Sequence, residues 1–184
     1  MSNSLSRRSR ASTTRSSAQK TVRAFNEVGL LAEEVVAQWL VQANHEILQR
    51  RWRCRWGELD LIASTHDRLG NATLIFVEVK ARRGHNWDED GLLAITVQKQ
   101  AKLLKAAQLF LAEQPQWVDC PCRFDVALVR CHPLTTTISP DLTLDVPDEI
   151  ASWVSSWVEI SNPVEIAGYQ LSLQRYIQDA FDQG

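Results

Sequence analysis

The sequence predicts one α/β domain whose elements follow the order α-β-β-β-α-β around a mixed central sheet, with a C-terminal extension. Three observations predict this fold class. The run LIFVEVKAR at residues 74–82 is apolar on both faces until Glu78, as in a strand that is covered on both sides. Apolar residues recur at helical spacing before and after a group of strand-like runs. The chain has 184 residues, 45% of them hydrophobic, which suffices for one packed core.

Each predicted element rests on its own periodicity. The first helix has an apolar stripe, and Glu33 lies at the border of that stripe. The first two strands alternate in polarity and meet at Gly57, which permits the turn of a hairpin. The second helix carries an apolar face with lysines on its other sides. In chain order we expect a helix over 28–41, strands over 47–56, 58–64 and 74–82, a helix over 96–113 and a half-buried strand over 123–129.

The extension has a weaker pattern. Residues 135–146 suggest a short strand pair, and a helix is expected to begin at Pro147 or Asp148. The last residues, YIQDAFDQG, suggest a short helical turn that ends the domain.

The segment from Gly57 to Arg82 carries the pattern richest in chemistry. An aspartate in GELDLI is followed about twenty residues later by a Glu-x-Lys in FVEVKAR. Side chains alternate along a strand, so Glu78 and Lys80 are neighbours on one face, and the hairpin brings Asp60 toward them. We therefore expect Asp60, Glu78 and Lys80 to lie at one site.

Two carboxylates and one amine are the smallest set for metal-assisted cleavage of a phosphodiester. A hard cation such as Mg²⁺ or Mn²⁺ takes oxygen ligands, so Asp60 and Glu78 are the predicted metal ligands. The ammonium of Lys80 is suited to orient a water and to neutralise charge on the phosphoryl oxygens. The alternative is an edge strand whose solvent face happens to hold Glu and Lys.

Several runs of this chain together resemble a known family. They are GLLAEEVVAQWL, RRWRCRWGELDLIA, FVEVKARR, TVQKQAKLLKAAQLFLA, DCPCRFDVALV and the closing IQDAF. The chain resembles the YraN-type family of uncharacterised proteins over residues 27–130. That family is similar in fold to the PD-(D/E)xK restriction-endonuclease and Holliday-junction-resolvase group.

The resemblance implies a restriction-endonuclease-like core and a nuclease signature at Asp60, Glu78 and Lys80. It also implies that Glu33 falls on an acidic position of the family's first helix and joins the catalytic set. The chain departs from the pattern at Ala32, where a Gly is usual, and at Arg51, where an Asn is usual. Residues 131–166 form a longer insertion than the family pattern has.

Basic residues around this site are candidates for binding a phosphate backbone. Arg51, Arg53 and Arg55 alternate along the first strand and form a predicted basic stripe, which is open to the alternative of a solvated face paired with acids. Trp52 and Trp56, on the other side, are expected to be core anchors. Three further candidates are Arg82 and Arg83 at the end of the third strand and Lys99 at the start of the second helix.

The net charge of −2 conceals an asymmetry along the chain. Residues 1–23 hold six basic residues and no acid, whereas residues 131–184 hold eight acids and one arginine. We expect 1–23 to be a disordered basic tail and 24–184 to be a single domain, with a core at 27–130 and an acidic extension at 131–184. A leader with a misassigned start codon is the alternative for residues 1–23.

The location is expected to be cytoplasmic and away from membranes, because no apolar run is long enough to span a bilayer and the N-terminus lacks the apolar core of a signal peptide. The four cysteines are expected to be reduced thiols, since the spacing of Cys120 and Cys122 is not a usual zinc pattern.

Together these patterns predict a metal-dependent endonuclease that hydrolyses DNA, possibly branched or structured DNA by analogy with the resolvases. The alternative is a non-catalytic nucleic-acid-binding or scaffold protein that keeps the nuclease fold. A third class is a homodimer or a protein-interaction module that docks through Trp153 and Trp157 of the extension.

Deletion of residues 1–23 should leave the fold intact, because the segment has no periodic apolar positions. The truncated chain should bind DNA more weakly, with a smaller dependence on salt. Binding titrations at several salt concentrations and a thermal melt check this, and a fall in Tm of several degrees would show that the tail is structural.

Overall fold

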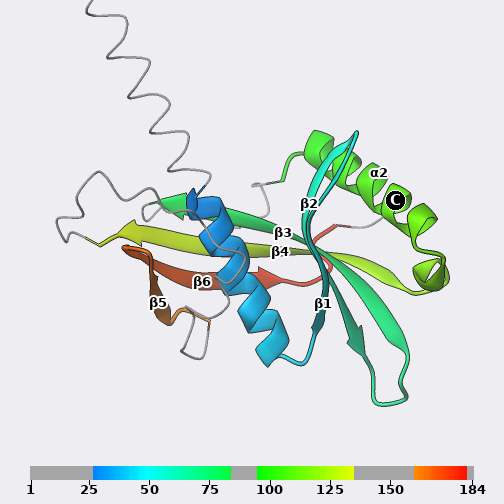
Figure 1. The fold of residues 1–184 in the computed structure, drawn as a ribbon, viewed down its shortest axis with the longest axis horizontal. Coiled ribbons are helices and arrows are strands. Elements are labelled where there is room, and N and C mark those ends of the chain that lie inside the picture. Colours follow the sequence, from blue (N-terminus) through cyan, green and yellow to red (C-terminus); the bar gives the residue numbers. More distant parts are fainter. Residues whose placement is uncertain (1–26, 84–94, 135–159, 182–184) are drawn as a thin grey trace, which may run out of the picture.

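The computed structural model of the chain describes residues 27–83, 95–134 and 160–181 (Figure 1). The predicted order α-β-β-β-α-β is confirmed within these residues. The elements are a helix over residues 27–42, β1 (Glu46–Cys54), β2 (Gly57–His66), β3 (Ala72–Arg83), α2 (Val97–Glu113), a short 3-10 helix η2 (Pro115–Trp117), β4 (Cys122–Pro133), β5 (Pro163–Ile166) and β6 (Tyr169–Ile177).

The six described strands form one mixed sheet in the order β1-β2-β3-β4-β6-β5. The central pair, β3 and β4, is parallel and registers Leu74 with Cys122 through to Arg83 with Cys131. The other neighbouring strands pair antiparallel. The parallel pair needs a crossover, and α2 lies in the connection between β3 and β4.

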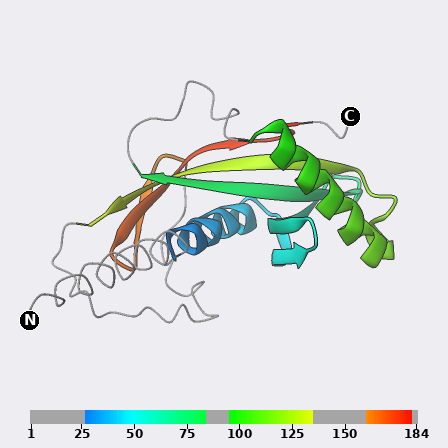
Figure 2. The ribbon, with the colours of Figure 1, turned by 90° about the horizontal axis from the view of Figure 1, so that it is seen from above.

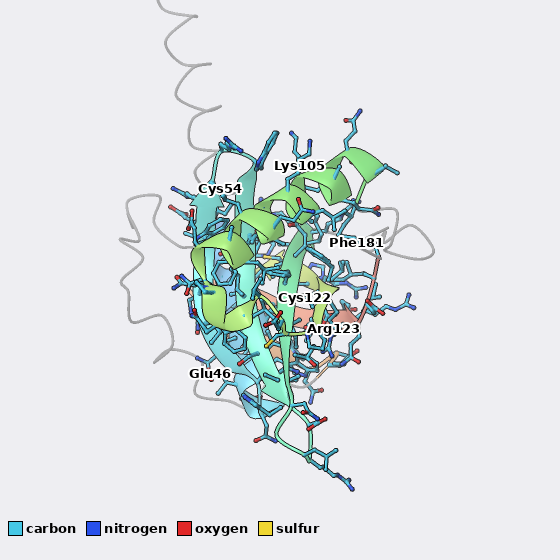
Figure 3. The ribbon with its side chains drawn as sticks, turned by 90° about the vertical axis from the view of Figure 1, so that its right-hand side faces the viewer. Glu46, Cys54, Lys105, Cys122, Arg123 and Phe181 are labelled. Atoms are coloured by element: carbon cyan, nitrogen blue, oxygen red, sulfur yellow. The ribbon has the colours of Figure 1, made fainter. Side chains whose placement is uncertain are left out.

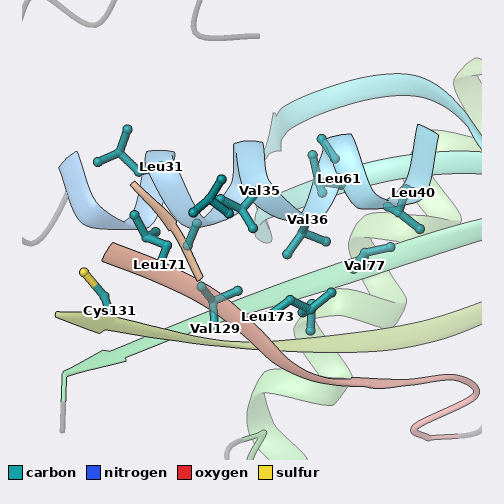
Figure 4. Packing of buried hydrophobic residues seen from close by; sticks show 14 of the residues in the cluster. Leu31, Val35, Val36, Leu40, Leu61, Val77, Val129, Cys131, Leu171 and Leu173 are labelled. Atoms are coloured by element: carbon teal, nitrogen blue, oxygen red, sulfur yellow. The ribbon is translucent and has the colours of Figure 1, made fainter. Parts of the chain in front are cut away.

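The two helices enclose the sheet with two separate hydrophobic clusters. The helix over residues 27–42 runs along one side of the strands (Figure 2), and its apolar stripe packs on β3, β4 and β6 (Figure 4). The second cluster joins the buried face of α2 to the opposite side of the same sheet. Residues of β3 alternate between the clusters, with Ile75 and Val77 in the first and Leu74 and Phe76 in the second. This confirms the predicted division of the β3 faces.

The end of the chain differs from the expectation. Residues 169–177 form β6, which pairs with β4 inside the sheet, where the sequence suggested a closing helical turn near Tyr176. The buried Leu171 and Leu173 fill the first hydrophobic cluster, so this strand completes the core. The expected strand pair at 135–146, the helix from Pro147 or Asp148, the tryptophans Trp153 and Trp157, and the tail at 1–23 lie outside the described residues.

A buried aspartate ties β4 to this last strand. Asp125 is fully buried, although the alternation of β4 predicted a half-exposed strand with Asp125 on its polar face. Its carboxylate accepts hydrogen bonds from the Tyr176 hydroxyl at 2.8 Å, the Asp179 backbone N–H at 2.9 Å and Arg123 Nε at 3.1 Å. Burial and the adjacent Asp125 charge raise the pKa of Tyr176, so the phenol keeps its proton and donates it. A buried carboxylate is tolerated here because donors surround it.

Two further features bear on the fold. The four cysteines are free, with Cys131 buried and the other three partly exposed. Among the described residues, no helix combines the length and the hydropathy that a membrane crossing requires.

Replacement of Tyr176 by Phe should destabilise the fold, because Asp125 then loses a donor in a site that water does not reach. We expect a loss of about 1–3 kcal/mol, seen as a fall in Tm of about 2–4 °C for each kcal/mol. Tyr169→Phe is the matched control, since the Tyr169 hydroxyl makes no hydrogen bond to another described residue. Equal Tm values for both variants would contradict a stabilising role of the Tyr176–Asp125 hydrogen bond.

Candidate active site

The candidate site lies where β2 and β3 separate. Their pairing runs from His66 and Ala72 to Leu61 and Val77, and it stops there. Beyond that point β2 continues to Gly57 beside β1, while β3 continues to Arg83 beside β4. The next residues of the two strands, Asp60 and Glu78, therefore flank the start of the gap.

The strand β2 also changes its orientation at this point. Leu59 and Leu61 are two residues apart and would share one face of a regular strand. Instead Leu59 packs in the α2 cluster and Leu61 in the cluster of the first helix. Asp60 lies between them, so the change of face occurs at the aspartate.

A side-chain hydrogen bond replaces the missing rung between the strands. Asp60 Oδ2 accepts the backbone N–H of Val79 at 2.8 Å. The N–H of Val79 would otherwise point at a partner that the separation has removed. Asp60 is thus held in the gap next to Glu78, which the sequence predicted.

Glu78 is the buried centre of the site, with 4% of its surface exposed. Its Oε1 atom lies 2.6 Å from Lys80 Nζ and 3.0 Å from Lys99 Nζ. Its Oε2 atom is buried and has no hydrogen-bond partner among the described residues. One carboxylate oxygen is therefore held by two ammonium groups, and the other is left over for a further ligand.

Lys99 reaches Glu78 because of how α2 begins. Thr96 caps the helix, and its hydroxyl accepts the backbone N–H of Lys99 at 3.3 Å. This places Lys99 in the first turn, next to β3. The sequence predicted Lys99 as a phosphate contact at the start of this helix. Its ammonium lies beside Glu78, and the binding of phosphate stays a prediction.

The carboxylates of the site repel one another. Burial and the charge of Glu78 raise the pKa of Asp60 to about 7, against the opposing effects of the Val79 N–H and the two lysines. Burial, followed by the charge of Asp60, raises the pKa of Glu33 from 4.5 to about 8. Glu33 therefore contributes to the site from the first helix, at electrostatic range of Asp60 and Glu78.

These residues fit a hard divalent cation. Within the described residues no three His, Cys, Asp or Glu side chains are grouped so as to enclose a metal ion by themselves. Mg²⁺ keeps several waters and needs only one or two carboxylates. The donors of the site are oxygens, one of which has no hydrogen-bond partner among the described residues, and burial together with the neighbouring carboxylates raises the pKa values of Asp60 and Glu33. A cation between Asp60 and Glu78 would relieve both conditions.

Comparison with known proteins shows the family. The profile of the uncharacterised protein family UPF0102 matches residues 32–129. The chain belongs to UPF0102. It is 48% identical to a UPF0102 protein of Acaryochloris marina over 159 residues, which cover 84% of this chain and 90% of the relative. A UPF0102 protein of Trichodesmium erythraeum is 48% identical over 84% of this chain and 88% of the relative, and one of Synechocystis is 40% identical over 85% and 99%.

The family match bears out the resemblance to the YraN-type proteins. It contains the helix with Glu33, the strands with Asp60, Glu78 and Lys80, and the start of α2 with Lys99. It ends within β4, so β5 and β6 of this UPF0102 chain lie beyond it.

The predicted arginine stripe of β1 is not a row of unpaired guanidinium groups. Arg51 and Arg53 both bind the Glu58 carboxylate, Arg53 through Nε at 2.9 Å. Arg51 has a left-handed backbone with φ of 51°, which breaks the strict alternation, and its Nε lies 3.7 Å from Glu33 Oε2. β1 ends at Cys54, so Arg55 lies in the hairpin turn and not in the strand.

The other basic candidates lie further from Glu78. Arg82 and Arg83 are exposed at the end of β3, and the Arg83 guanidinium lies 5.7 Å from the centre of the Tyr169 ring. Their proposed binding of phosphate stays a prediction.

Sequence reasoning missed Glu58 as the acid that binds the arginines. The signal was present, since Glu58 pairs with Arg53 across a hairpin turn centred on residues 55 and 56. The hydrogen bonds from Arg51 and Arg53 lower the pKa of Glu58 against the effect of its burial. Glu58 therefore stays charged beside Glu33.

Replacement of Glu33 by Gln should stabilise the metal-free protein at pH 8 and change it much less at pH 5. The folded-state pKa lies above the unfolded value, so the folded protein holds the proton more tightly, and stability falls as pH rises toward about 8. Removal of the charge should restore about 1–2 kcal/mol at pH 8. Thermal melts in a chelator at both pH values measure the effect.

Glu113→Gln, an exposed change at the end of α2, is the control for the loss of one carboxylate. It should shift Tm little at either pH. A Glu33→Gln protein that is less stable than the parent at pH 8 would show that Glu33 is held by favourable charges.

Proposed function

We propose that this UPF0102 protein is a divalent-metal-dependent endonuclease that hydrolyses phosphodiester bonds in DNA. The observation that carries the proposal is the meeting of Asp60 and Glu78 at the strand separation, with an ammonium on Glu78 Oε1 and the second Glu78 oxygen left over. Two oxygen ligands beside an amine are the parts that metal-assisted hydrolysis needs. Mg²⁺ or Mn²⁺ is the cofactor that this donor set suits.

Asp60 and Glu78 are the residues that would hold the cation. When bound, such a cation polarises a phosphoryl oxygen and lowers the pKa of a coordinated water. The hydrogen bond from Val79 fixes the carboxylate of Asp60, so little rotamer freedom remains to be lost on binding.

Lys80 is suited to the chemical step. Its ammonium is held by Glu78 Oε1, and about a quarter of the side chain remains exposed, so it can donate to a water or to a phosphoryl oxygen in the gap. Such a donor stabilises the charge that develops on the oxygens around phosphorus. Lys99 supplies a second positive charge from the other side of the same oxygen.

Glu33 is the nearest candidate for moving a proton. Its pKa of about 8 keeps it largely protonated near neutral pH while the charge of Asp60 is present. An acid with a pKa near the working pH is suited to exchange protons with water or with the leaving oxygen.

One observation favours the alternative of a nucleic-acid-binding or scaffold protein without turnover. Lys80 and Lys99 together already neutralise the charge of Glu78. A buried carboxylate with two ammonium partners is also a stable structural triad. The two functions differ in whether a metal ion changes the protein and whether DNA is cut.

Two variants separate metal binding from chemistry. Asp60→Asn should lose both metal binding and cleavage, because it removes an anionic ligand. Lys80→Ala should abolish cleavage while leaving Mn²⁺ affinity nearly unchanged, since it removes a positive charge near the cation and no ligand. Calorimetric titration with Mn²⁺ and single-turnover cleavage of duplex, single-stranded and junction DNA measure the two effects.

Lys102→Ala is the matched control, because it removes an exposed lysine from α2 one turn beyond Lys99. It should leave metal binding and cleavage close to the parent values. Full activity of Lys80→Ala, or equal loss of metal binding in both site variants, would contradict the proposed roles. Mn²⁺-independent binding of DNA without any cleavage would support the scaffold alternative.

A further inference from the structure

The tip of the β1–β2 hairpin presents an aromatic ring between cations. Trp56 was expected to be a core anchor, but 37% of its surface is exposed. Trp52, four residues earlier, does meet that expectation, since it packs edge-on against Phe110 of α2 at 5.5 Å. The two tryptophans of the hairpin therefore have different roles.

Two basic side chains lie over the Trp56 ring. Lys105 Nζ of α2 is 4.4 Å from the ring centre, and the Arg55 guanidinium is 5.3 Å from it. Among the described residues neither Arg55 nor Lys105 has an ion pair with a carboxylate. Figure 3 shows Lys105 at the same end of the molecule as Cys54, the last residue of β1.

The surrounding charge is positive as well. Arg53, whose side chain is 68% exposed, shares the one carboxylate of Glu58 with Arg51. Arg51 also lies 3.7 Å from Glu33, so the excess positive charge at the tip comes from Arg55 and Lys105. The tip thus combines an exposed π surface with cations that acids do not fully neutralise.

The tip lies at a fixed distance from the candidate active site. Lys99 binds Glu78, and Lys105 lies over Trp56, six residues further along the same helix. At a rise of 1.5 Å per residue this is about 9 Å. The three residues of β2 from Gly57 to Asp60 give about 10 Å by a separate route. Both backbone paths are short, so the tip lies beside the candidate active site.

We propose that Trp56 is a stacking platform for an unpaired nucleotide, with Arg55 and Lys105 holding its phosphates. Base stacking on an aromatic ring beside basic groups is how proteins bind single strands without reading sequence. The inference rests on the proposed nuclease function and adds the substrate class, which is nucleic acid with a single-stranded segment close to the bond that is cut. A base pair inside an intact duplex cannot stack in this way, because its faces are covered by its neighbours.

Binding measured in a chelator tests this without any cleavage. The probes are a labelled single-stranded oligonucleotide and the blunt duplex of the same sequence, followed by fluorescence anisotropy. Trp56→Leu should weaken binding of the single strand about tenfold, because stacking is worth about 1–3 kcal/mol per base. Its salt dependence should not change, and binding of the duplex should be nearly unaffected. Trp56→Phe should retain most of the affinity.

Two charge variants complete the test. Lys105→Ala should reduce the slope of log affinity against log salt by about 0.7 for the single strand. Arg68→Ala removes one charge from the turn at the other end of β2 and should change neither the affinity nor the slope appreciably. An effect of Arg68→Ala as large as that of Lys105→Ala would overturn the assignment of the phosphate contacts to the tip.

The test of Trp56 and the test of the nuclease activity can fail independently of each other. Trp56→Leu binding the single strand as tightly as the parent would overturn the platform. The platform would also be overturned if Trp56→Leu lost equal affinity for the single strand and the duplex and had a lower Tm. That pattern is expected if the cation–π contacts only stabilise the hairpin. A parent protein that shows Trp56-dependent binding but cuts no DNA with Mn²⁺ would refute the nuclease and retain the platform.

Discussion

The hydrogen bond from the Val79 backbone to Asp60 organises the site, because it lets two paired strands separate without leaving a buried N–H unsatisfied. When two strands separate in the middle of a sheet, a backbone hydrogen bond between them is normally lost. Here the Asp60 side chain accepts that hydrogen bond through one of its oxygens, and its carboxylate lies between the strands, near Glu78. The change of face between Leu59 and Leu61 occurs at the same residue. The geometry of the strand and the position of the carboxylate therefore have one cause.

The electrostatics of the site follow from this placement. Three acids, Glu33, Asp60 and Glu78, come from a helix and two strands and meet where water is scarce. Lys80 and Lys99 offset part of their charge through a single oxygen of Glu78. Burial, together with the remaining negative charge, raises the pKa values of Asp60 and Glu33. Protons and a divalent cation should consequently compete for the same carboxylates, and the cation should win more easily as pH rises.

Much of this was predictable from short-range patterns in the sequence. The alternation of LIFVEVKAR placed Glu78 and Lys80 on one face, and the structure agrees, with Phe76 and Leu74 of the same face in the α2 cluster. The helices, the hairpin at Gly57 and the order of the core elements also follow from periodicity. In these segments one physical factor, the burial of one face, dominates the choice of residues.

The misses arise where tertiary contacts decide. Asp125 is in an apolar strand, where Arg123 supplies one donor, and the other two donors, Tyr176 and Asp179, lie 51 and 54 residues further along the chain. The sequence predicted a closing helical turn from Tyr176 and no strand before it, because the pairing of β6 with β4 is long-range and contains a register shift at Leu128 and Val129. The alternation of the strand predicts Trp52 and Trp56 on the same face. The strand ends at Cys54, however, so Trp56 lies in the turn and its ring is partly exposed. The meeting of Lys99 with Glu78 required the direction of α2, which periodicity does not give.

The Asp125 network has a consequence for the synthesis of the protein. The carboxylate lies in β4, whereas two of its donors, Tyr176 and Asp179, follow it by 51 and 54 residues and are made later. Until those residues leave the ribosome, the Asp125 carboxylate has Arg123 as a partner but lacks these two donors, and the edge of β4 that pairs with β6 is uncovered. The nascent chain can assemble the first helix and β1 to β3 in advance, but the sheet can close only after β6 has been made. A protein shortened by its last ten residues would keep every residue of the candidate site and still lack the contacts that make the core complete.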